Sequence, residues 1–484
     1  MSLYSPGAVY WLDQMAVDLD RISEIELMQR AGECVWVRLI ERWPETTAIT
    51  VLVGNGNNGG DAFVVALCAR AAGVHVQLLV QGDLNRQSEA ARHFCQQWQA
   101  SGGHQEVWRQ QVLAGDLVVD GLLGIGLRRE LDQDWQALIT AINQHPGPKV
   151  AIDIPSGLDG LTGIPQPVAV RADLTVTFIG EKTGQYLADG PDYCGELVLE
   201  NLGVSTAARA RVPATLPVIE SCRLPSPRQI NTHKNCYGHI LIVGGDQGMG
   251  GAVLLAARAA LRSGAGVVTA LMHPDCVSRF APAAEVMVSD WSQLDVKLNQ
   301  ASLVIVGPGL GDSAAALACL QRLRNSELPM VVDASALRND FLNGRDNTNV
   351  VITPHPGEAG RLLDITTASV QADRVEACHR LTERFGATCI LKGSGTLVAD
   401  TAQIVINRRG HPGMASAGMG DVLAGMVGAY LGQGLDGFDA ACAAVFVHAV
   451  AADLFAIEQD QIGMIASDVI ERIPRASREV RDGI

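Results

Sequence analysis

The sequence VLVGNGNNGGD at residues 51–61 carries the strongest fold signal in the chain. An apolar run that reads as a buried strand passes directly into glycines and asparagines, and a helical pattern follows at residues 62–70. Glycines at such a strand-to-helix turn let the backbone approach a ligand closely, and the helix N-terminus offers N–H donors to a phosphate. The stretch therefore predicts a parallel α/β sheet with a ligand site at this turn.

Short apolar runs recur along the chain and alternate with helical or polar segments. In the first half they fall at residues 48–53, 74–80, 117–122, 150–154 and 174–179. In the second half they fall at residues 239–243, 267–272, 303–306, 330–332, 350–353 and 389–391, with Ala-rich helical segments at 252–261 and 440–454. This alternation is typical of βαβ crossovers, so we expect a mostly parallel sheet in each half.

The alternation stops around residues 205–233, where four prolines lie among small, basic and polar residues. This is the composition of a linker. We therefore expect an α/β chain of two domains, with the first at residues 1–215, a linker at 216–230 and the second at 231–484. Before the first strand, residues 11–30 show apolar positions at helical spacing, which predicts one amphipathic helix that belongs to the scaffold rather than to a site.

Composition narrows the possible classes of partner. The 484 residues include 37 Lys and Arg and 52 Asp and Glu, which gives a net charge of −15. This charge argues against nucleic acid or an anionic membrane as a binding partner. Eleven cysteines show no C-x-x-C spacing, so reduced thiols are expected rather than disulfides or zinc sites. The chain shows no basic and apolar leader and no apolar run of about 18 residues, which predicts a cytoplasmic protein. Because parallel α/β domains of this size commonly associate, we also expect a homo-oligomer.

Two later strand ends in the first half repeat the polar pattern of the opening stretch, VVDGLLGIG at 118–126 and DIPSGLDG at 153–160. The carboxyl ends of parallel strands meet at one edge of a sheet, so Asn58, Asp120 and Ser156 could meet there. Their oxygen atoms suit a monovalent or divalent hard cation rather than zinc. Taken singly, each residue is equally typical of a helix cap or a turn.

The ordered motifs GNGNNGGDAF, VVDGLLGIG, DIPSGLDG and FIGEKTGQY resemble the N-terminal epimerase domain of bacterial NAD(P)H-hydrate repair proteins, over residues 10–205. The resemblance implies a Rossmann-like three-layer sandwich and a K⁺ ion held by Asn58, Asp120 and Ser156. It also implies substrate contacts from Asn57, Asn58, Gly59, Gly60, Asp61, Gly124, Ile125, Gly126, Leu127, Arg128, Arg129, Glu130 and Asp153. Ala62 departs from the glycine that the family usually has there, which concerns only the local shape of the loop.

Epimerisation of such a substrate inverts C6 of the hydrated nicotinamide ring. Either the carbon–oxygen bond or the ring must open and re-form, and both routes need a general acid/base. Asp153 is the first candidate because it lies at a strand end beside the expected cation site, and Asp61 is the second. In the alternative reading, this domain only binds a nucleotide or a partner protein.

In the second half, the densest signal is NRRGHPGMASAGMGDVLAG at residues 407–425. Small residues and glycines lead into an apolar helix that is expected to begin near Asp421, so backbone N–H groups can form an anion hole and the Asp421 carboxylate can reach a substrate hydroxyl. An aspartate at a helix N-cap would be ordinary, but the long glycine-rich approach favours a catalytic role. Two further loops, KGSGT at 392–396 and TPHPGE at 353–358, indicate a nucleotide cradle and a substrate contact at His355.

The segments HKNCYGHILIVGG, ALRSGAGVVT, VGPGLG, TPHPGE, LKGSGT and GMASAGMGDVLAG resemble the NAD(P)H-hydrate dehydratase branch of the ribokinase-like superfamily, over residues 225–480. By this resemblance, Ala252, Gly309, His355 and Asp421 contact the hydrated cofactor, whereas Lys392, Gly393, Ser394, Gly395, Thr396 and Gly420 contact the nucleotide. Mg²⁺ and ADP would be required, although nothing in the residues separates ADP from ATP. Met419 replaces the threonine common at this position, so only its backbone donor remains for the anion hole.

Together these features predict a bifunctional repair enzyme. The first domain would interconvert the R and S forms of hydrated NADH and NADPH, and the second would dehydrate the S form while ADP becomes AMP and phosphate. One alternative is a small-molecule kinase fused to a nucleotide-binding domain, which would yield a stable phosphorylated product. Another is a cofactor-binding or scaffold protein, which would bind tightly without turnover.

Overall fold

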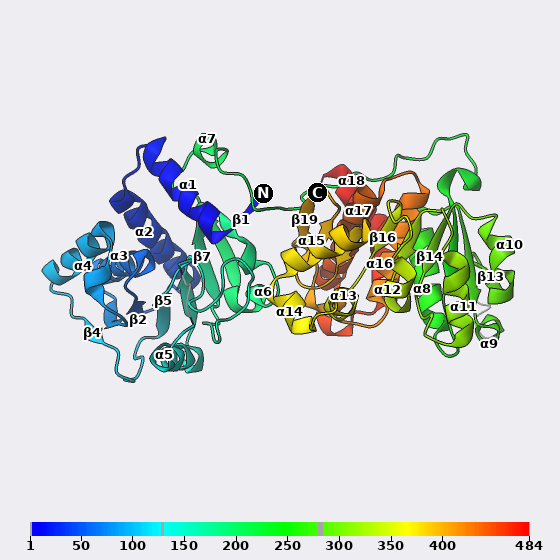
Figure 1. Ribbon diagram of the computed structural model, residues 1–484. Coiled ribbons are helices and arrows are strands. Elements are labelled where there is room, and N and C mark those ends of the chain that lie inside the picture. The colour runs from blue at the N-terminus through cyan, green and yellow to red at the C-terminus, as the bar shows by residue number, and fades with distance from the viewer. Residues whose placement is uncertain (1, 127–129, 279–283, 484) are drawn as a thin grey trace. The chain divides into compact units, whose positions relative to one another are not determined.

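The computed structural model describes residues 2–126, 130–278 and 284–483. The chain separates into two compact units, Met1–Pro217 and Val218–Ile484, and each is a parallel α/β body of its own (Figure 1).

Seven parallel strands form the main sheet of the first unit, in the order β4-β3-β2-β5-β6-β7-β9. Their bounds are Ala48–Val53 (β2), His75–Val80 (β3), Glu106–Val107 (β4), Leu117–Gly121 (β5), Lys149–Ile152 (β6), Leu174–Phe178 (β7) and Glu196–Glu200 (β9). β2 pairs with both β3 and β5, so the strand order reverses beside it. In an open parallel sheet, this switch point is where a ligand crevice forms.

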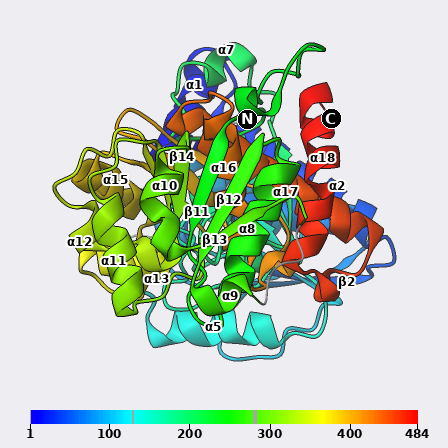
Figure 2. The same cartoon turned by 90° about the vertical axis from the view of Figure 1, so that its right-hand side faces the viewer.

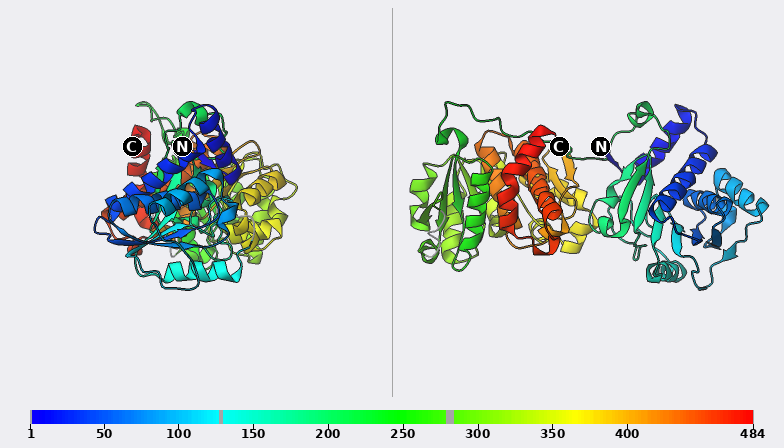
Figure 3. Two further views of the ribbon diagram at one scale, coloured as in Figure 1. Left: turned by 90° about the vertical axis from the view of Figure 1, so that its left-hand side faces the viewer. Right: turned by 180° about the vertical axis from the view of Figure 1, so that it is seen from behind.

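Helices cover both faces of this sheet. Their bounds are Asn57–Ala71 (α3), Glu89–Ala100 (α4), Gln133–Gln144 (α5), Gly190–Cys194 (α6) and Thr206–Arg209 (α7), with α1 and α2 before them. One core cluster joins α2, α3 and α4 to the sheet through Val35, Phe63 and Phe94, and another packs α5 against it through Trp135. Figure 3, left, shows the blue helices above the sheet and the cyan α5 below it. The result is a three-layer sandwich.

The segment before the first long strand forms two helices, α1 at Pro6–Asp18 and α2 at Glu24–Arg42. The expectation of a single helix over residues 11–30 was therefore wrong. Arg21 takes a left-handed backbone conformation with φ of 58°, and the Ser23 hydroxyl caps α2 by accepting from the Glu26 N–H at 3.2 Å. A serine cap followed by Glu at the third helical position is a helix-start signal, so the break was visible in the sequence.

A small second sheet ties the chain's start to later parts of the first unit. β1 (Ser2–Tyr4) pairs in parallel with β8 (Glu181–Lys182) and antiparallel with β10 (Leu216–Pro217). Regular structure thus reaches into the first two residues of the expected linker. Beyond Pro217 the described chain has no helix or strand until the short 3₁₀ turn at Lys234–Tyr237.

Nine strands form the sheet of the second unit, in the order β13-β12-β11-β14-β15-β16-β17-β18-β19. Their bounds are His239–Val243 (β11), Val267–Met272 (β12), Met287–Asp290 (β13), Leu303–Val306 (β14), Met330–Val332 (β15), Val350–Ile352 (β16), Thr388–Leu391 (β17), Thr396–Ala399 (β18) and Ile404–Asn407 (β19). The strands are parallel from β13 through β17, and β18 and β19 are antiparallel additions.

Helices lie on both sides of this sheet too. Figure 2 shows α8, α17 and α18 on one side of β11 and β12, and α11 and α13 on the other. The bounds are Gly250–Arg262 (α8), Pro274–Val277 (α9), Leu294–Leu298 (α10), Ala314–Leu323 (α11), Asn339–Leu342 (α12), Pro356–Leu363 (α13), Thr367–Ala372 (α14), Arg374–Phe385 (α15), Met419–Gly432 (α16), Gly437–Glu458 (α17) and Ala466–Asp482 (α18). α17 is long and apolar enough to cross a membrane, but it is mostly buried inside this unit, where Phe446 joins the core.

Candidate functional sites

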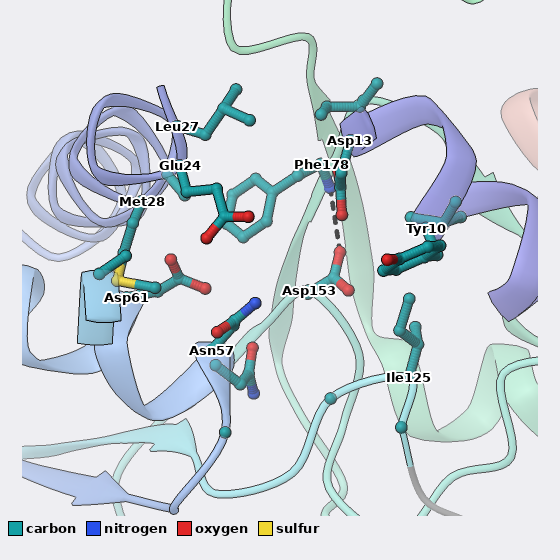
Figure 4. A pocket seen from close by; sticks show the side chains of 18 of the residues that line it. Tyr10, Asp13, Glu24, Leu27, Met28, Asn57, Asp61, Ile125, Asp153 and Phe178 are labelled. Carbon is teal, nitrogen blue, oxygen red and sulfur yellow. Dashed lines mark hydrogen bonds between the residues drawn. The ribbon is translucent and has the colours of Figure 1, made fainter. Parts of the chain in front are cut away.

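A pocket of about 740 Å³ opens at the switch point of the first unit (Figure 4). Its floor comes from the loops after β2 and β5, and its walls come from α1, α2 and the loop after β6. A volume of this size is within the range of small-molecule and cofactor sites. The predicted contact residues that line it are Asn57, Asn58, Asp61, Gly124, Ile125, Gly126 and Asp153.

Asn58, Asp120 and Ser156 meet beneath this pocket, around the main chain of Leu123. The buried Asp120 carboxylate accepts hydrogen bonds from the Ser156 hydroxyl at 2.6 Å and from the Ser156 N–H at 2.8 Å. The Asn58 amide donates to the Leu123 carbonyl at 3.1 Å, and the Ser156 hydroxyl lies 3.2 Å from the same carbonyl. Burial raises the pKa of Asp120 to about 6, although hydrogen bonds from Ser156 oppose the shift. Carboxylate, amide, hydroxyl and carbonyl oxygens in one place fit a hard cation such as K⁺.

Three glycines of the opening motif, Gly54, Gly59 and Gly60, serve close packing, whereas Gly56 faces open space and lines the pocket. A side chain on Gly54 would lie 1.7 Å from the Leu122 carbonyl oxygen, so only glycine lets the two floor loops touch. Gly59 packs on Gly54 and Gly60 packs on Met28, and neither lines the pocket. The buried Ala62 side chain fills the space beside Gly121, where an added Cβ would lie 2.4 Å from it.

The remaining predicted contacts in this unit lie elsewhere. Glu130 is exposed and does not line the pocket. Leu127, Arg128 and Arg129 lie outside the described residues.

Asp153 is held in place by Lys182, a fully buried lysine of β8. The Lys182 ammonium donates to Asp153 Oδ1 and, at 2.8 Å, to the Thr177 hydroxyl. The Phe178 N–H also donates to Asp153 Oδ1, at 3.2 Å. Asp153 has a φ of 65°, a conformation that costs free energy outside glycine and that clusters at functional sites. Lys182 stands inside the FIGEKTGQY motif, but nothing in the sequence indicated which carboxylate it would pair with.

Other carboxyl groups face Asp153 across the pocket. Figure 4 shows Asp13, Glu24 and Asp61 around it, from α1, α2 and α3. Burial raises the pKa of Asp13 to about 7, with a further rise from the negative charge of Asp153. Burial also raises the pKa of Asp61 well above its usual range, again with contributions from Asp153 and Asp13. The raised pKa values of Asp13 and Asp61 favour their protonated forms near neutral pH, as a general acid requires.

α1 is part of the pocket wall and not only of the scaffold, which corrects the expectation from the sequence. Tyr10, Asp13, Gln14 and Val17 line the pocket at the i, i+3, i+4, i+7 spacing of one helix face. Asp13 was missed because the amphipathic pattern of this segment was explained by packing alone.

In the second unit, Asp421 is the third residue of α16, and Gly418 rather than Asp421 occupies the N-cap position. Burial raises the pKa of Asp421 to about 7, the nearby Asp333 adds to the rise, and Lys392 opposes it. Met419 points its side chain into the core, so the start of α16 offers backbone donors to an anion. Gly420 leaves room beside Lys392, whose Nζ would lie 3.3 Å from an added Cβ.

Lys392 is at the centre of a buried polar cluster. Its ammonium donates to Asp333 Oδ1 at 2.9 Å and lies 3.8 Å from Glu358 Oε2, and the Thr353 hydroxyl donates to the same Asp333 atom at 2.7 Å. Burial lowers the pKa of Lys392, but the carboxylates of Asp333 and Glu358 raise it above its usual value overall. Asp333 was missed, although it directly follows the predicted strand at residues 330–332.

The loop from Lys392 to Thr396 is fixed from below by Arg374, a buried residue at the start of α15. The Arg374 guanidinium donates to the carbonyls of Leu391 and Lys392 at 3.2 Å each, and to that of Gly395 at 3.4 Å. Ser394 and Gly393 are exposed, so the loop presents its backbone to solvent. A rigid, glycine-rich backbone of this kind can cradle nucleotide phosphates.

Ala252 lies in the first turn of α8, Gly309 lies in the loop after β14, and His355 is the N-cap of α13. Gly309 has a φ of 58° and packs on α8, where an added Cβ would lie 3.1 Å from Ala252 Cβ. His355 caps α13, because its Nδ1 accepts from the Gly357 N–H at 3.0 Å. The His355 side chain is 52% exposed, so the capping role leaves its outer edge open to a ligand.

The part of the chain that the structure describes contains no metal centre of the usual kind. Among residues 2–126, 130–278 and 284–483, no group of three or more His, Cys, Asp or Glu side chains is arranged to hold a metal ion. The oxygen cluster around Asp120 is of another kind, since it contains a single carboxylate.

Comparison with known proteins gives matches to both units. A family described as YjeF-related protein N-terminus matches residues 24–184, and a family described as NAD(P)H-hydrate dehydratase matches residues 240–475. The chain is 40% identical over 480 residues to the bifunctional NAD(P)H-hydrate repair enzyme Nnr of Coxiella burnetii, which covers 97% of this chain and 98% of that one. It is 38% identical over 494 residues to the enzyme of the same name from Escherichia coli, with coverages of 99% and 95%.

One solved structure is similar over 55% of this chain and 99% of its own. It is the ADP/ATP-dependent NAD(P)H-hydrate dehydratase from Bacillus subtilis, co-crystallised with ATP and Mg²⁺, at 25% identity and a TM-score of 0.50.

Proposed function

The chain belongs to the family of bifunctional NAD(P)H-hydrate repair enzymes, and from this membership we propose how its two sites divide the work. The first unit interconverts the R and S forms of hydrated NADH and NADPH. The second dehydrates the S form with ADP, which gives NADH or NADPH, AMP and phosphate. The observation that carries this division is that the strand-end site of each unit has a carboxyl group whose pKa is raised to about 7, Asp13 beside Asp153 in the first unit and Asp421 in the second.

In the epimerase unit, Asp153 is the proposed general acid/base at the substrate. Its Oδ1 accepts hydrogen bonds from Lys182, Thr177 and Phe178, and Asp153 lines the pocket. Asn58, Asp120 and Ser156 would hold K⁺, which supplies positive charge under the substrate when bound. The tyrosine and valine face of α1 offers apolar surface to the rings of the dinucleotide.

In the dehydratase unit, Asp421 accepts the proton of the C6 hydroxyl while that oxygen attacks the β-phosphorus of ADP and AMP departs. The N–H groups at the start of α16 bind the transferred phosphoryl group, and Mg²⁺ on the nucleotide phosphates lowers their negative charge. The phosphorylated oxygen then leaves C6 as inorganic phosphate. The departing phosphate accepts a proton from C5, which restores the dihydropyridine ring. We place Lys392 as the support of Asp333, and the backbone of residues 393–396 as the nucleotide cradle.

Two further parts of the proposal concern the whole protein. A cytoplasmic location fits its eleven free cysteines, which would stay reduced there. A homo-oligomeric state stays a prediction from the size and class of the domains.

The deciding experiment follows absorbance at 340 nm with a mixture of R and S hydrated NADH, Mg²⁺, K⁺ and either ADP or ATP. We expect complete recovery of NADH with one phosphate released per molecule, and the faster nucleotide identifies the donor. Recovery that stops at the S fraction would remove the epimerase activity from the proposal. A stable phosphorylated product without NADH would replace the dehydratase by a kinase.

A further inference from the structure

α1 lies before residues 24–184, the range matched by the family model of the first unit, yet it forms one wall of the pocket. Leu12 and Ala16 are fully buried and fix the helix to the core. The opposite stripe presents Tyr10 and Asp13 to the pocket interior. A helix anchored in this way can hold a reacting group in a defined position, because its own side chains prevent rotation about the helix axis.

Asp13 is the charged group of that stripe, and charged groups from four other parts of the first unit act on it or lie beside it. Asp153 from the loop after β6 and Lys182 from β8 act on it, as do Glu24 from α2 and Asp61 from α3. In Figure 4 the carboxyl groups of Asp13 and Asp153 point toward one another at the edge of the pocket. Three of these neighbours of Asp13 are acidic and only Lys182 is basic.

The carboxyl groups of Asp153 and Asp13 have different charged neighbours. Asp153 is paired with the buried ammonium of Lys182, so a positive charge lies directly beside it. Asp13 has no comparable cation bound directly to it among the described residues, and its burial and the charge of Asp153 favour its protonated form. The pocket thus has a carboxyl group suited to give a proton, Asp13, and facing it a carboxyl group with a cation beside it, Asp153.

Inversion at C6 needs both functions on adjacent atoms, because the carbon carries the hydroxyl oxygen and the ring nitrogen N1. We propose that Asp13 is the general acid of the epimerase unit and that Asp153 is its basic partner. This inference rests on the proposed epimerase function and adds a catalytic residue to it.

The step balances without any further reactant. Asp153 takes the hydroxyl proton, the oxygen forms the carbonyl bond to C6, and the C6–N1 bond breaks with its electron pair going to N1. Asp13 gives its proton to N1, which leaves an open-chain aldehyde. After rotation about the C5–C6 bond, N1 attacks the other face of the aldehyde, returns its proton to Asp13, and the oxygen regains a proton from Asp153. Both carboxyl groups end in their starting states, and the product is the other epimer.

The test uses the full chain without nucleotide, so that the dehydratase is idle and the appearance of the S form from purified R hydrated NADH is followed by chromatography. We expect Asp13→Asn to lower kcat for epimerisation by about 100-fold or more, with KM changed by less than about threefold. Asp18→Asn is the matched control, since it makes the same change at an exposed position of the same helix and is expected to match the wild type. Thermal melting and the dehydration of S hydrate, measured separately with ADP, show that each variant is folded.

The pH profile separates a proton donor from a structural residue. An acid must be protonated to act, so wild-type kcat/KM is expected to hold below about pH 7 and to fall as the pH rises above it. Asp13→Asn should lose this alkaline limb. Asp13→Glu keeps a carboxyl group but moves it by one methylene. A reduced kcat with the fall in kcat/KM above about pH 7 retained would support the assignment, even if the asparagine variant were unstable.

The outcomes are distinct. If the wild type and Asp18→Asn do not epimerise above the uncatalysed rate, the proposed function fails. If both epimerise and folded Asp13→Asn matches them, or if Asp13→Asn changes KM alone, only the role of Asp13 is overturned.

Discussion

At the scale of single residues, Asp421 is largely buried and lies near a second carboxylate, that of Asp333. Both effects disfavour its ionised form, and its pKa of about 7 places proton uptake in the neutral range. A general base works best when its pKa is close to the working pH, since it is then both available and basic enough. The start of α16 adds N–H donors beside it, so the same turn of helix serves the hydroxyl and the phosphoryl group.

We predict that Asp421→Asn lowers kcat for dehydration by about 10²- to 10⁴-fold and leaves epimerisation unchanged. In the wild type, dehydration should rise with pH through about 7 as the base loses its proton. Because the folded pKa lies above the unfolded value of 3.8, this carboxyl stabilises the fold most at low pH, and the contribution is lost as the pH rises through about 7. Asp421→Asn should therefore be at least as stable as the wild type at pH 8.

Absorbance at 340 nm with S hydrated NADH and ADP measures this rate, and urea unfolding at pH 5 and pH 8 measures the stability. Dehydration at the wild-type rate in the folded variant would contradict the role of Asp421.

Sequence reasoning could find Asp153 and Asp421 because each has a local signal, a strand end in one case and a glycine-rich helix start in the other. Lys182 and Asp333 had no such signal for their roles. Their partners, Asp153 and Lys392, lie 29 and 59 residues away, so only the folded sheet shows the pairs. Asp13 was hidden for another reason, because a polar residue on an amphipathic helix is ordinarily exposed to solvent.

At the scale of elements, α15 and the loop between β17 and β18 form one functional unit. The buried guanidinium of Arg374 satisfies three loop carbonyls, and burial lowers its pKa to about 10 without removing its charge at neutral pH. Gly393 and Gly395 both have positive φ values, which glycine adopts readily. Because glycine is flexible in the unfolded chain, ordering the loop costs conformational entropy, and the Arg374 contacts offset this cost.

We predict that Arg374→Met raises KM for ADP by roughly tenfold and lowers the free energy of unfolding by roughly 1–3 kcal/mol, because the loop carbonyls lose a charged donor. Arg380→Met is the matched control, since Arg380 is exposed on the same helix and should change neither quantity. Dehydration at varied ADP and urea unfolding provide the two measurements. An unchanged KM for ADP in a folded Arg374→Met chain would show that the loop does not bind the nucleotide.

The central strands of both sheets were predicted, because they form apolar runs between helical segments, but β4, β9, β13 and β19 were missed. Four of the second unit's strands, His239–Val243, Val267–Met272, Leu303–Val306 and Met330–Val332, have the bounds expected from the sequence. The N-terminal helices were merged in error, because apolar spacing continues through the break and only the Ser23 cap interrupts it. Periodicity finds elements well and finds their ends poorly.

At the scale of the whole molecule, the two units repeat one arrangement with different chemistry. In each, polar loops gather at the carboxyl ends of parallel strands, and the strand order reverses beside the first strand of the sheet, β2 or β11. The described core clusters are each built from residues of one unit. Substitutions in one site should therefore leave the other site intact.

We predict that two inactive chains complement each other in solution. With R hydrated NADH and ADP, Asp153→Asn alone and Asp421→Asn alone should each fail to form NADH beyond the uncatalysed background. An equimolar mixture should recover NADH completely, because one chain releases the S form and the other consumes it. If the mixture forms NADH more than about tenfold more slowly than the wild type at equal site concentrations, the S form passes only between units of one chain.

The position of β1 and α1 affects the order in which the first unit can fold during synthesis. Ser5, the N-cap of α1, donates its N–H to the hydroxyl of Thr215 at 2.8 Å, a contact across 210 residues, and β1 pairs with β10 at the same place. At about 5–20 residues per second, a ribosome takes roughly 10–40 s to cover that distance. The helix that carries Asp13 is therefore synthesised long before β10, and the contacts that hold its N-terminal end form only after that strand has emerged.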